Sequence, residues 1–165
     1  MSEKKILDKM KIKYKGVFDL SELYKIMWIW LGNNGYDWHE TEYADKQVGP
    51  TVKQVEIKWR GEKTVSDYVD HWLYIDMFIM LSDAEIEKDG VKIKTNSGEI
   101  EFRITAIVET DYMNEWTDKP LTRFLRDWYD RFIIKGRLEE TEQELWDDAQ
   151  DFAIEVKAFL DLYQY

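Results

Sequence analysis

Cysteine is absent from the 165 residues of this chain, and its absence excludes several kinds of chemistry together. Disulfides, thiolate nucleophiles, iron–sulfur clusters and cysteine-based zinc sites all need this residue. Histidine is scarce, so a transition metal or a histidine base would depend on His39, His71 and the carboxylates. The chain also has no glycine-rich phosphate loop, no G-x-S-x-G elbow and no dinucleotide fingerprint. We therefore expect no metal, no cofactor and a binding protein rather than an enzyme.

Long hydrophobic runs are missing as well. The longest, at 26–31 and 77–81, are far shorter than the about 20 residues that a membrane-spanning helix needs. The N-terminus has no apolar segment of the kind that forms a secretory signal. Together with the lack of cysteine, these absences predict a cytoplasmic protein without a membrane span. The length predicts one domain over 1–165, because domains usually hold roughly 100–200 residues.

Positive charge is in deficit, and the formal net charge is -11. An acidic chain repels phosphate backbones, so we expect no general nucleic-acid binding. The charges are unevenly placed, with six lysines in 1–15 and nine acidic residues against one lysine in 139–165. The acidic segment can be a solvated helix face. Alternatively, the basic start is attracted to it, within one chain or between two chains.

Aromatic residues are plentiful, with eight Trp, ten Tyr and seven Phe, and many recur at the spacing of strands or helices. Alternation of apolar and polar residues predicts strands over 9–18, 38–46, 55–60, 65–81, 85–95 and 99–109. The second half of 65–81 is apolar on both faces, which is typical of a central strand. Turn signals separate the strands at Gly49-Pro50, Gly61-Glu62, Asp89-Gly90 and Asn96-Ser97-Gly98.

Three segments have the 3.6-residue period of a helix instead. Asp19, with Glu22 three residues later, forms a capping box for a first helix, which Gly32 and Gly35 end. A second helix is predicted over 120–135, with Thr117 or Asp118 as its cap and Gly136 at its end. A second capping box, Thr141 to Glu144, predicts that the last helix starts there and runs to 163.

These elements predict an α+β domain. We expect an antiparallel sheet of five or six strands, with one N-terminal helix and a C-terminal helix pair packed on it. The order of elements resembles the helix-grip fold of START-like ligand-binding proteins, in which a curved sheet wraps a long last helix. The resemblance covers most of the chain, rests on element order alone, and implies an apolar ligand between sheet and helix. The chain departs from the pattern in having one helix after the first strand, and two helices at its end.

Two functions remain open. The first is a cavity between the sheet and the C-terminal helix that holds a small apolar or aromatic molecule, since such pockets are mostly apolar with a few polar groups. We expect Asp76 or His71 to supply the polar groups, and the predicted lining comprises Trp59, Trp72, Tyr74, Phe102, Phe152 and Phe159. The second is a protein-interaction module or homodimer without a ligand. Its interface would include Trp28, Trp30 and Trp128, because aromatics are enriched at interface cores.

Several charged residues have two interpretations each. Asp70 and Asp76 share a strand face with aromatic residues, so a buried carboxylate there would have a raised pKa and could act as an acid or bind a cation. Alternatively, Asp70 lies at a wet end of the strand and Asp76 pairs with an arginine or a tyrosine hydroxyl. The segment from His39 to Glu42 is more typical of a mixed polar surface strand than of a metal site. Basic residues near Trp128 could stack on bases or meet lipid, but a solvated amphipathic helix also explains Arg123, Arg126, Arg131, Lys135 and Arg137.

Overall fold

The structure is a computed structural model that describes residues 2–110, 120–132 and 135–161. Within these ranges it does not describe the side chains at 88, 126 and 129–132. The predicted cap at Thr117 or Asp118 lies outside the described residues. The elements are, in order, β1 (Ser2–Phe18), α1 (Leu20–Asn33), β2 (Asp37–Gln47), β3 (Val52–Thr64), β4 (Val69–Lys88), β5 (Val91–Thr110), α2 (Pro120–Phe132) and α3 (Lys135–Asp161).

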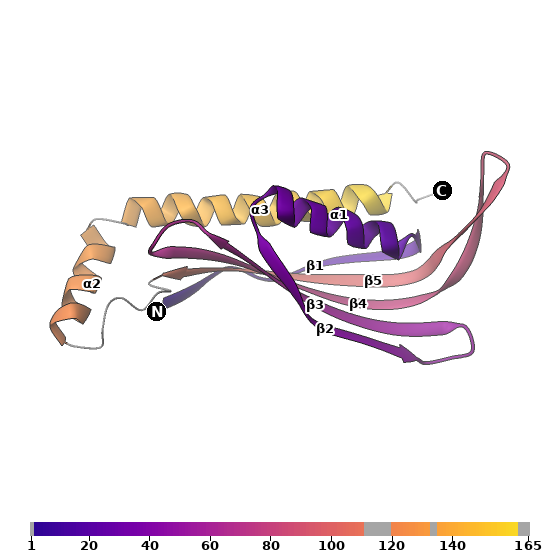
Figure 1. Cartoon of the computed structure of the whole chain (residues 1–165), viewed down its shortest axis with the longest axis horizontal. Helices are drawn as coiled ribbons and strands as arrows, with labels where there is room; N and C mark the ends of the chain where they lie inside the picture. Colours follow the sequence, from indigo (N-terminus) through magenta and orange to yellow (C-terminus); the bar gives the residue numbers. More distant parts are fainter. Residues whose placement is uncertain (1, 111–119, 133–134, 162–165) are drawn as a thin grey trace.

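The described strands form one antiparallel sheet in the order β1-β5-β4-β3-β2, with α1 and α3 on one of its faces (Figure 1). The α+β class predicted from the sequence is therefore confirmed. Strand β4 is at the centre, as its two apolar faces predict, and the predicted strand over 38–46 is β2 at one edge. The basic β1 closes the other edge beside β5, and Lys4 Nζ lies 2.9 Å from a carboxylate oxygen of Glu142 on α3. The basic start and the acidic segment thus meet within one chain.

The core fills the layer between the sheet and its two helices. Alternate residues of each strand point to one face, and Ile57, Leu73, Ile75 and Phe102 are fully buried there. Helix α3 contributes side chains at helical spacing: Leu145, Ala149, Phe152, Ala153, Val156 and Leu160. Because burying one such large apolar side chain stabilises the fold by roughly 1.5–3 kcal/mol, this layer is the main source of stability.

Two predicted turns are wrong. Strands β4 and β5 form one long hairpin whose turn is Asp89-Gly90, and Asn96-Ser97-Gly98 lies inside β5. Gly98 is required there because a Cβ at this position would collide with the backbone oxygen of Met80 on β4. Gly61 is likewise inside β3, buried against Leu31 and Tyr36, and the chain turns at 65–68 instead. Gly98 permits a close approach between two strands, and neither glycine is a sign of a turn.

The division between the last two helices also differs from the prediction. Gly136 and Thr141 both lie inside α3, which starts at Lys135. Among the described residues nothing lies within 4 Å of a Cβ built at Gly136, so the helix there is opposed only by the intrinsic cost of glycine. Of the C-terminal pair, α3 covers the sheet, whereas α2 lies past the end of the sheet beside the first turns of α3 (Figure 1). Among the described helices, none is long and apolar enough to cross a membrane.

Candidate functional site

The middle of the layer between sheet and helices is packed solid around Trp59. Its ring stacks on Trp38 at 4.1 Å and meets Tyr24 edge-on at 4.7 Å. Its Nε1 donates to Glu40 Oε1 at 3.1 Å. Phe102 and Phe152 are equally inaccessible, and none of the pockets described below is lined by these side chains. Trp59, Phe102 and Phe152 therefore contribute packing where the sequence predicted a cavity wall.

The other predicted lining residues are divided between the two faces of the sheet. His71 is on the helix side, and Phe159 is half-buried near the end of α3. Trp72, Tyr74 and Asp76 are on the opposite, outer face, where they face neither helix. The eight predicted residues therefore do not surround one space.

On the outer face, the residues of β4 find partners on the neighbouring strands. Asp76 pairs with Arg60 at 2.9 Å, which is the alternative that the sequence left open for this carboxylate. The Arg60 guanidinium also lies over the Tyr74 ring, 4.3 Å from its centre. Trp72 Nε1 donates to Glu109 at 2.8 Å. These contacts explain the residue types at 72, 74 and 76 without a ligand.

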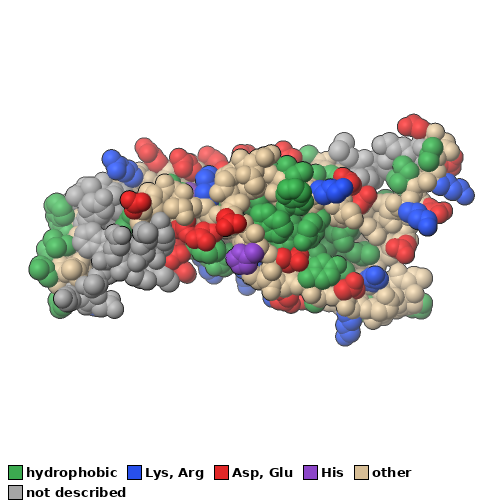
Figure 2. Space-filling view, viewed as in Figure 1, with side chains coloured by type: hydrophobic (Ala, Val, Ile, Leu, Met, Phe, Trp, Pro, Cys, Tyr) green, Lys and Arg blue, Asp and Glu red, His purple; other side chains and the backbone are tan. Residues whose placement is uncertain are grey.

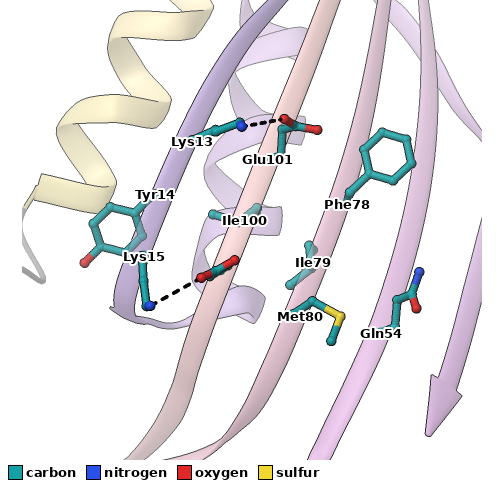
Figure 3. A pocket seen from close by; sticks show the side chains of 10 residues that line it. Lys13, Tyr14, Lys15, Gln54, Phe78, Ile79, Met80, Ile100 and Glu101 are labelled. Carbon is teal, nitrogen blue, oxygen red and sulfur yellow. Dashed lines mark ion pairs between the residues drawn. The ribbon is translucent and has the colours of Figure 1, made fainter. Parts of the chain in front are cut away.

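A first pocket, of about 530 Å³, lies further along the outer face (Figure 3). Phe78 and Met80 of β4 form its apolar floor, and Gln54 of β3 stands on one side. On the other side its charged residues form ion pairs with one another, Lys13 with Glu101 at 3.5 Å and Lys15 with Glu99 at 3.4 Å. The pocket therefore has no unmatched charge that a ligand would satisfy.

A second pocket, of about 460 Å³, lies between α3 and the turn that joins β3 to β4. We call it the end cleft, and its lining comprises Val65, Ser66, Asp67, Tyr68, Val69, Arg137, Leu138, Glu140, Thr141 and Glu144. Ser66 Oγ accepts the backbone N–H groups of Tyr68 and Val69 at 3.3 and 3.1 Å, which fixes the turn. Val69 is buried and Leu138 half-buried, so the cleft has an apolar wall. The cleft opens between the sheet and the C-terminal helix.

The charged residues of the end cleft are mostly acidic. Glu140, Glu144 and Asp148 follow one another at intervals of four residues, so they lie in a row along α3. Asp148, at the inner end of the row, accepts a hydrogen bond from the Tyr36 hydroxyl at 2.7 Å and pairs with Lys63 at 3.4 Å. Burial raises the pKa of Tyr36, and the hydrogen bond to Asp148 raises it further. The acidic row thus runs from the cleft to Asp148, beside the sheet–helix layer. Figure 2 shows acidic side chains along the upper edge of the molecule, where α3 runs in the same view.

Behind the cleft wall, His71 follows Val69 on the same face of β4. It is completely buried, and neither ring nitrogen has a hydrogen-bond partner. Burial lowers the pKa of His71 to about 4, and the nearby charge of Lys63 lowers it further. The imidazole is therefore neutral near pH 7. The sequence predicts Asp76 or His71 as the polar groups of a pocket, and the structure gives His71 as a core histidine without a hydrogen-bond partner among the described residues.

Asp70 points to the opposite face and is also completely buried, so its predicted alternative at a wet end of the strand is wrong. Its two oxygens accept no hydrogen bond from the described residues. Burial raises the pKa of Asp70 well above its usual range, and the neighbouring Glu62 carboxylate raises it further. The raised pKa is what the sequence predicts for a buried carboxylate on this face.

The remaining candidates are near the surface. His39 is exposed on β2, and no cluster of three or more metal-ligating side chains occurs among the described residues. Trp30 packs against Tyr36 and Phe152 at ring distances of 6.0 and 5.3 Å, so it belongs largely to the core. Trp28 is 44% exposed on α1, and Trp128 is 48% exposed on α2.

Sequence reasoning missed the end cleft and the residues that stand behind it. The contacts of Asp148 with Tyr36 and Lys63 join three separate segments of the chain, so they follow from the tertiary fold alone. The acidic row on α3 was the available signal, because carboxylates repeat at intervals of four residues there. No protein-family model, curated protein or solved structure matches this chain.

Proposed function

We propose that this protein is a small-molecule binding domain without enzymatic activity, and that its ligand binds in the end cleft. The observation that carries the proposal is the pocket of about 460 Å³ between α3 and the β3–β4 turn. Ligand sites usually have volumes of roughly 300–1,000 Å³, an apolar wall and a few polar groups. The resemblance to helix-grip proteins gives the same expectation of a ligand between sheet and last helix.

The apolar residues of the cleft suit a small apolar or aromatic ligand body. Val65, Val69 and Leu138 provide aliphatic contacts, and Tyr68 adds an aromatic ring. The proposal replaces the lining predicted from the sequence, because Trp59, Phe102 and Phe152 are sealed in the core.

A cleft-filling variant tests the proposal. Thr141 is half-buried in the cleft wall, and Thr141→Trp should fill the space without touching the core. We expect a screen of small aromatic and aliphatic compounds to find ligands that raise the melting temperature of the natural chain. The same compounds should leave the melting temperature of Thr141→Trp unchanged.

Ala158→Trp is the matched control, because it adds the same ring at an exposed position of α3 away from the cleft. It should keep the response of the natural chain. Compounds that stabilise Thr141→Trp as strongly as the natural chain would place binding elsewhere and refute the proposal. Loss of the response in Met80→Trp instead would assign binding to the outer pocket.

A second candidate function is self-association through α2. Four large apolar side chains of this helix are exposed, by 70% at Leu121, 66% at Phe124, 43% at Leu125 and 48% at Trp128. They lie at helical spacing on one face, and exposed apolar faces of this kind often mark interfaces. If two copies pair through α2, sedimentation velocity should show a dimer that dissociates on dilution and is lost in Phe124→Glu. A monomer at every concentration would exclude this candidate.

A further inference from the structure

The charges of the end cleft point to the chemical class of its ligand. We propose that the cleft takes a molecule with an apolar or aromatic body and a positively charged amine. The inference rests on the proposed function of the cleft and adds the charge of the ligand. It follows from a comparison of which acidic side chains form ion pairs or hydrogen bonds and which do not.

Three of the four charged side chains that line the cleft are acidic, namely Asp67, Glu140 and Glu144, against Arg137. Glu140 and Glu144 are four residues apart on α3, and like charges at this spacing repel each other. Asp148 is one turn further along the same row, where its charge is balanced by Lys63. A cation in the cleft would therefore relieve a repulsion that already exists along the helix.

The acidic side chains that line the cleft are not neutralised by a neighbouring cation among the described residues, whereas Asp148 beyond the lining is. Asp148 is balanced by Lys63 and by the Tyr36 hydroxyl. In contrast, Asp67, Glu140 and Glu144 take part in none of the ion pairs or side-chain hydrogen bonds found among the described residues.

The outer pocket provides a comparison within the same molecule. There each of the acidic lining residues, Glu99 and Glu101, has a lysine within 3.5 Å (Figure 3). A bound cation would find no free carboxylate in that pocket. The end cleft has carboxylates without a cationic partner, so an amine should bind in the end cleft in preference to the outer pocket.

Two more features favour a cation. Tyr68 lines the cleft, and the face of an aromatic ring attracts ammonium groups. The net charge of -11 gives the whole molecule a field that steers cations toward it.

Three probes of similar shape test the inference: phenethylamine, phenethyl alcohol and hydrocinnamate, which are positive, neutral and negative. Backbone amide chemical shifts would report where each probe binds and how tightly. We expect phenethylamine to shift the amides of Val69, Leu138 and Thr141, with an affinity at least about fivefold above that of the alcohol, since nearby charges attract strongly in a partly closed site. Hydrocinnamate should bind more weakly than the alcohol.

Glu140→Gln with Glu144→Gln should lower the affinity for phenethylamine to about that for the alcohol, and leave the affinity for the alcohol unchanged. Asp151→Asn with Glu155→Gln is the matched control, because it removes two charges from exposed positions of the same helix outside the cleft. This control should keep the preference for the amine.

The outcomes separate the two proposals. If the alcohol or hydrocinnamate binds in the cleft as tightly as the amine, the proposal that the ligand is positively charged is wrong, whereas the cleft remains a binding site. If none of the three probes shifts the cleft amides and the compound screen finds no ligand that Thr141→Trp removes, the proposed function fails and the inference fails with it.

Discussion

Acidification should destabilise this protein through His71, whose neutral imidazole is completely buried without a hydrogen-bond partner. The pKa of His71 is lowered from 6.5 to about 4, first by burial and then by the charge of Lys63. The unfolded chain therefore binds a proton on His71 at a higher pH than the folded chain does. The free energy of unfolding must fall as the pH drops from about 6.5 to about 4, because the unfolded state takes up the proton across that window.

The size of the effect follows from the two pKa values. A tenfold change in proton affinity is worth about 1.4 kcal/mol, so the difference between 6.5 and about 4 corresponds to about 3 kcal/mol. Asp70 acts in the opposite direction, because its pKa is raised in the folded state. The folded chain gains a proton there as the pH falls, so the stability linked to Asp70 is present at low pH and lost as the pH rises. The natural chain should therefore show a shallower dependence on pH than His71 alone would give.

Asp70→Asn removes the opposing group, and Asp70→Asn combined with His71→Gln removes both. Urea unfolding followed by tryptophan fluorescence, at a series of pH values from neutral to acidic, would give the free energy of unfolding of each variant. As the pH falls from about 6.5 to about 4, the free energy of unfolding of Asp70→Asn should decrease by about 3 kcal/mol more than that of the double variant. Equal losses in the two variants would refute the inference that a buried, neutral His71 links stability to pH.

Three further substitutions, two of them with a comparison variant, test the packing and the cap of α1. Trp59→Ala should cost about 3–5 kcal/mol in urea unfolding, because it empties a fully buried site, and a cost below that of Trp28→Ala on the surface would contradict the packing. Gly98→Ala should destabilise the chain strongly through the collision with the backbone of β4, whereas Gly32→Ala in α1 meets nothing within 4 Å and should be neutral or stabilising. Equal melting temperatures for the two alanine variants would contradict this contrast. Asp19→Ala should cost about 1 kcal/mol by removing the cap of α1, whose carboxylate accepts the Glu22 N–H at 3.2 Å.

The fold class could be predicted because the local signals and the packing agree. Ile57 and Trp59 alternate with charged residues on β3, and the fold buries that apolar face. Asp19 caps α1 as its spacing from Glu22 predicts. In these cases the residues that decide the structure are neighbours in sequence, so the pattern is sufficient.

The predicted turn at Asn96-Ser97-Gly98 was wrong because the deciding contact is distant in sequence. Glycine suits a tight turn, and it also suits a strand that approaches another backbone closely. The neighbour that requires glycine at 98 is Met80, on a different strand. Similarly, Gly136 and Thr141 resemble helix end and start signals, yet both lie inside α3.

The site could not be predicted for a related reason. Both faces of β4 are rich in apolar residues, so the pattern does not say whether His71 or Trp72 faces the helices. The end cleft is built from the 65–68 turn and the first turns of α3. Nothing local to either segment indicates that they meet.

Native mass spectrometry of freshly purified protein would show whether a small molecule occupies the end cleft. We expect the natural chain of 20.0 kDa to carry an additional mass of roughly a few hundred daltons, which is the size of ligand that fits such a pocket. Thr141→Trp, purified in the same way, should show the mass of the chain alone. A natural chain without additional mass, or an adduct that Thr141→Trp retains, would contradict the account.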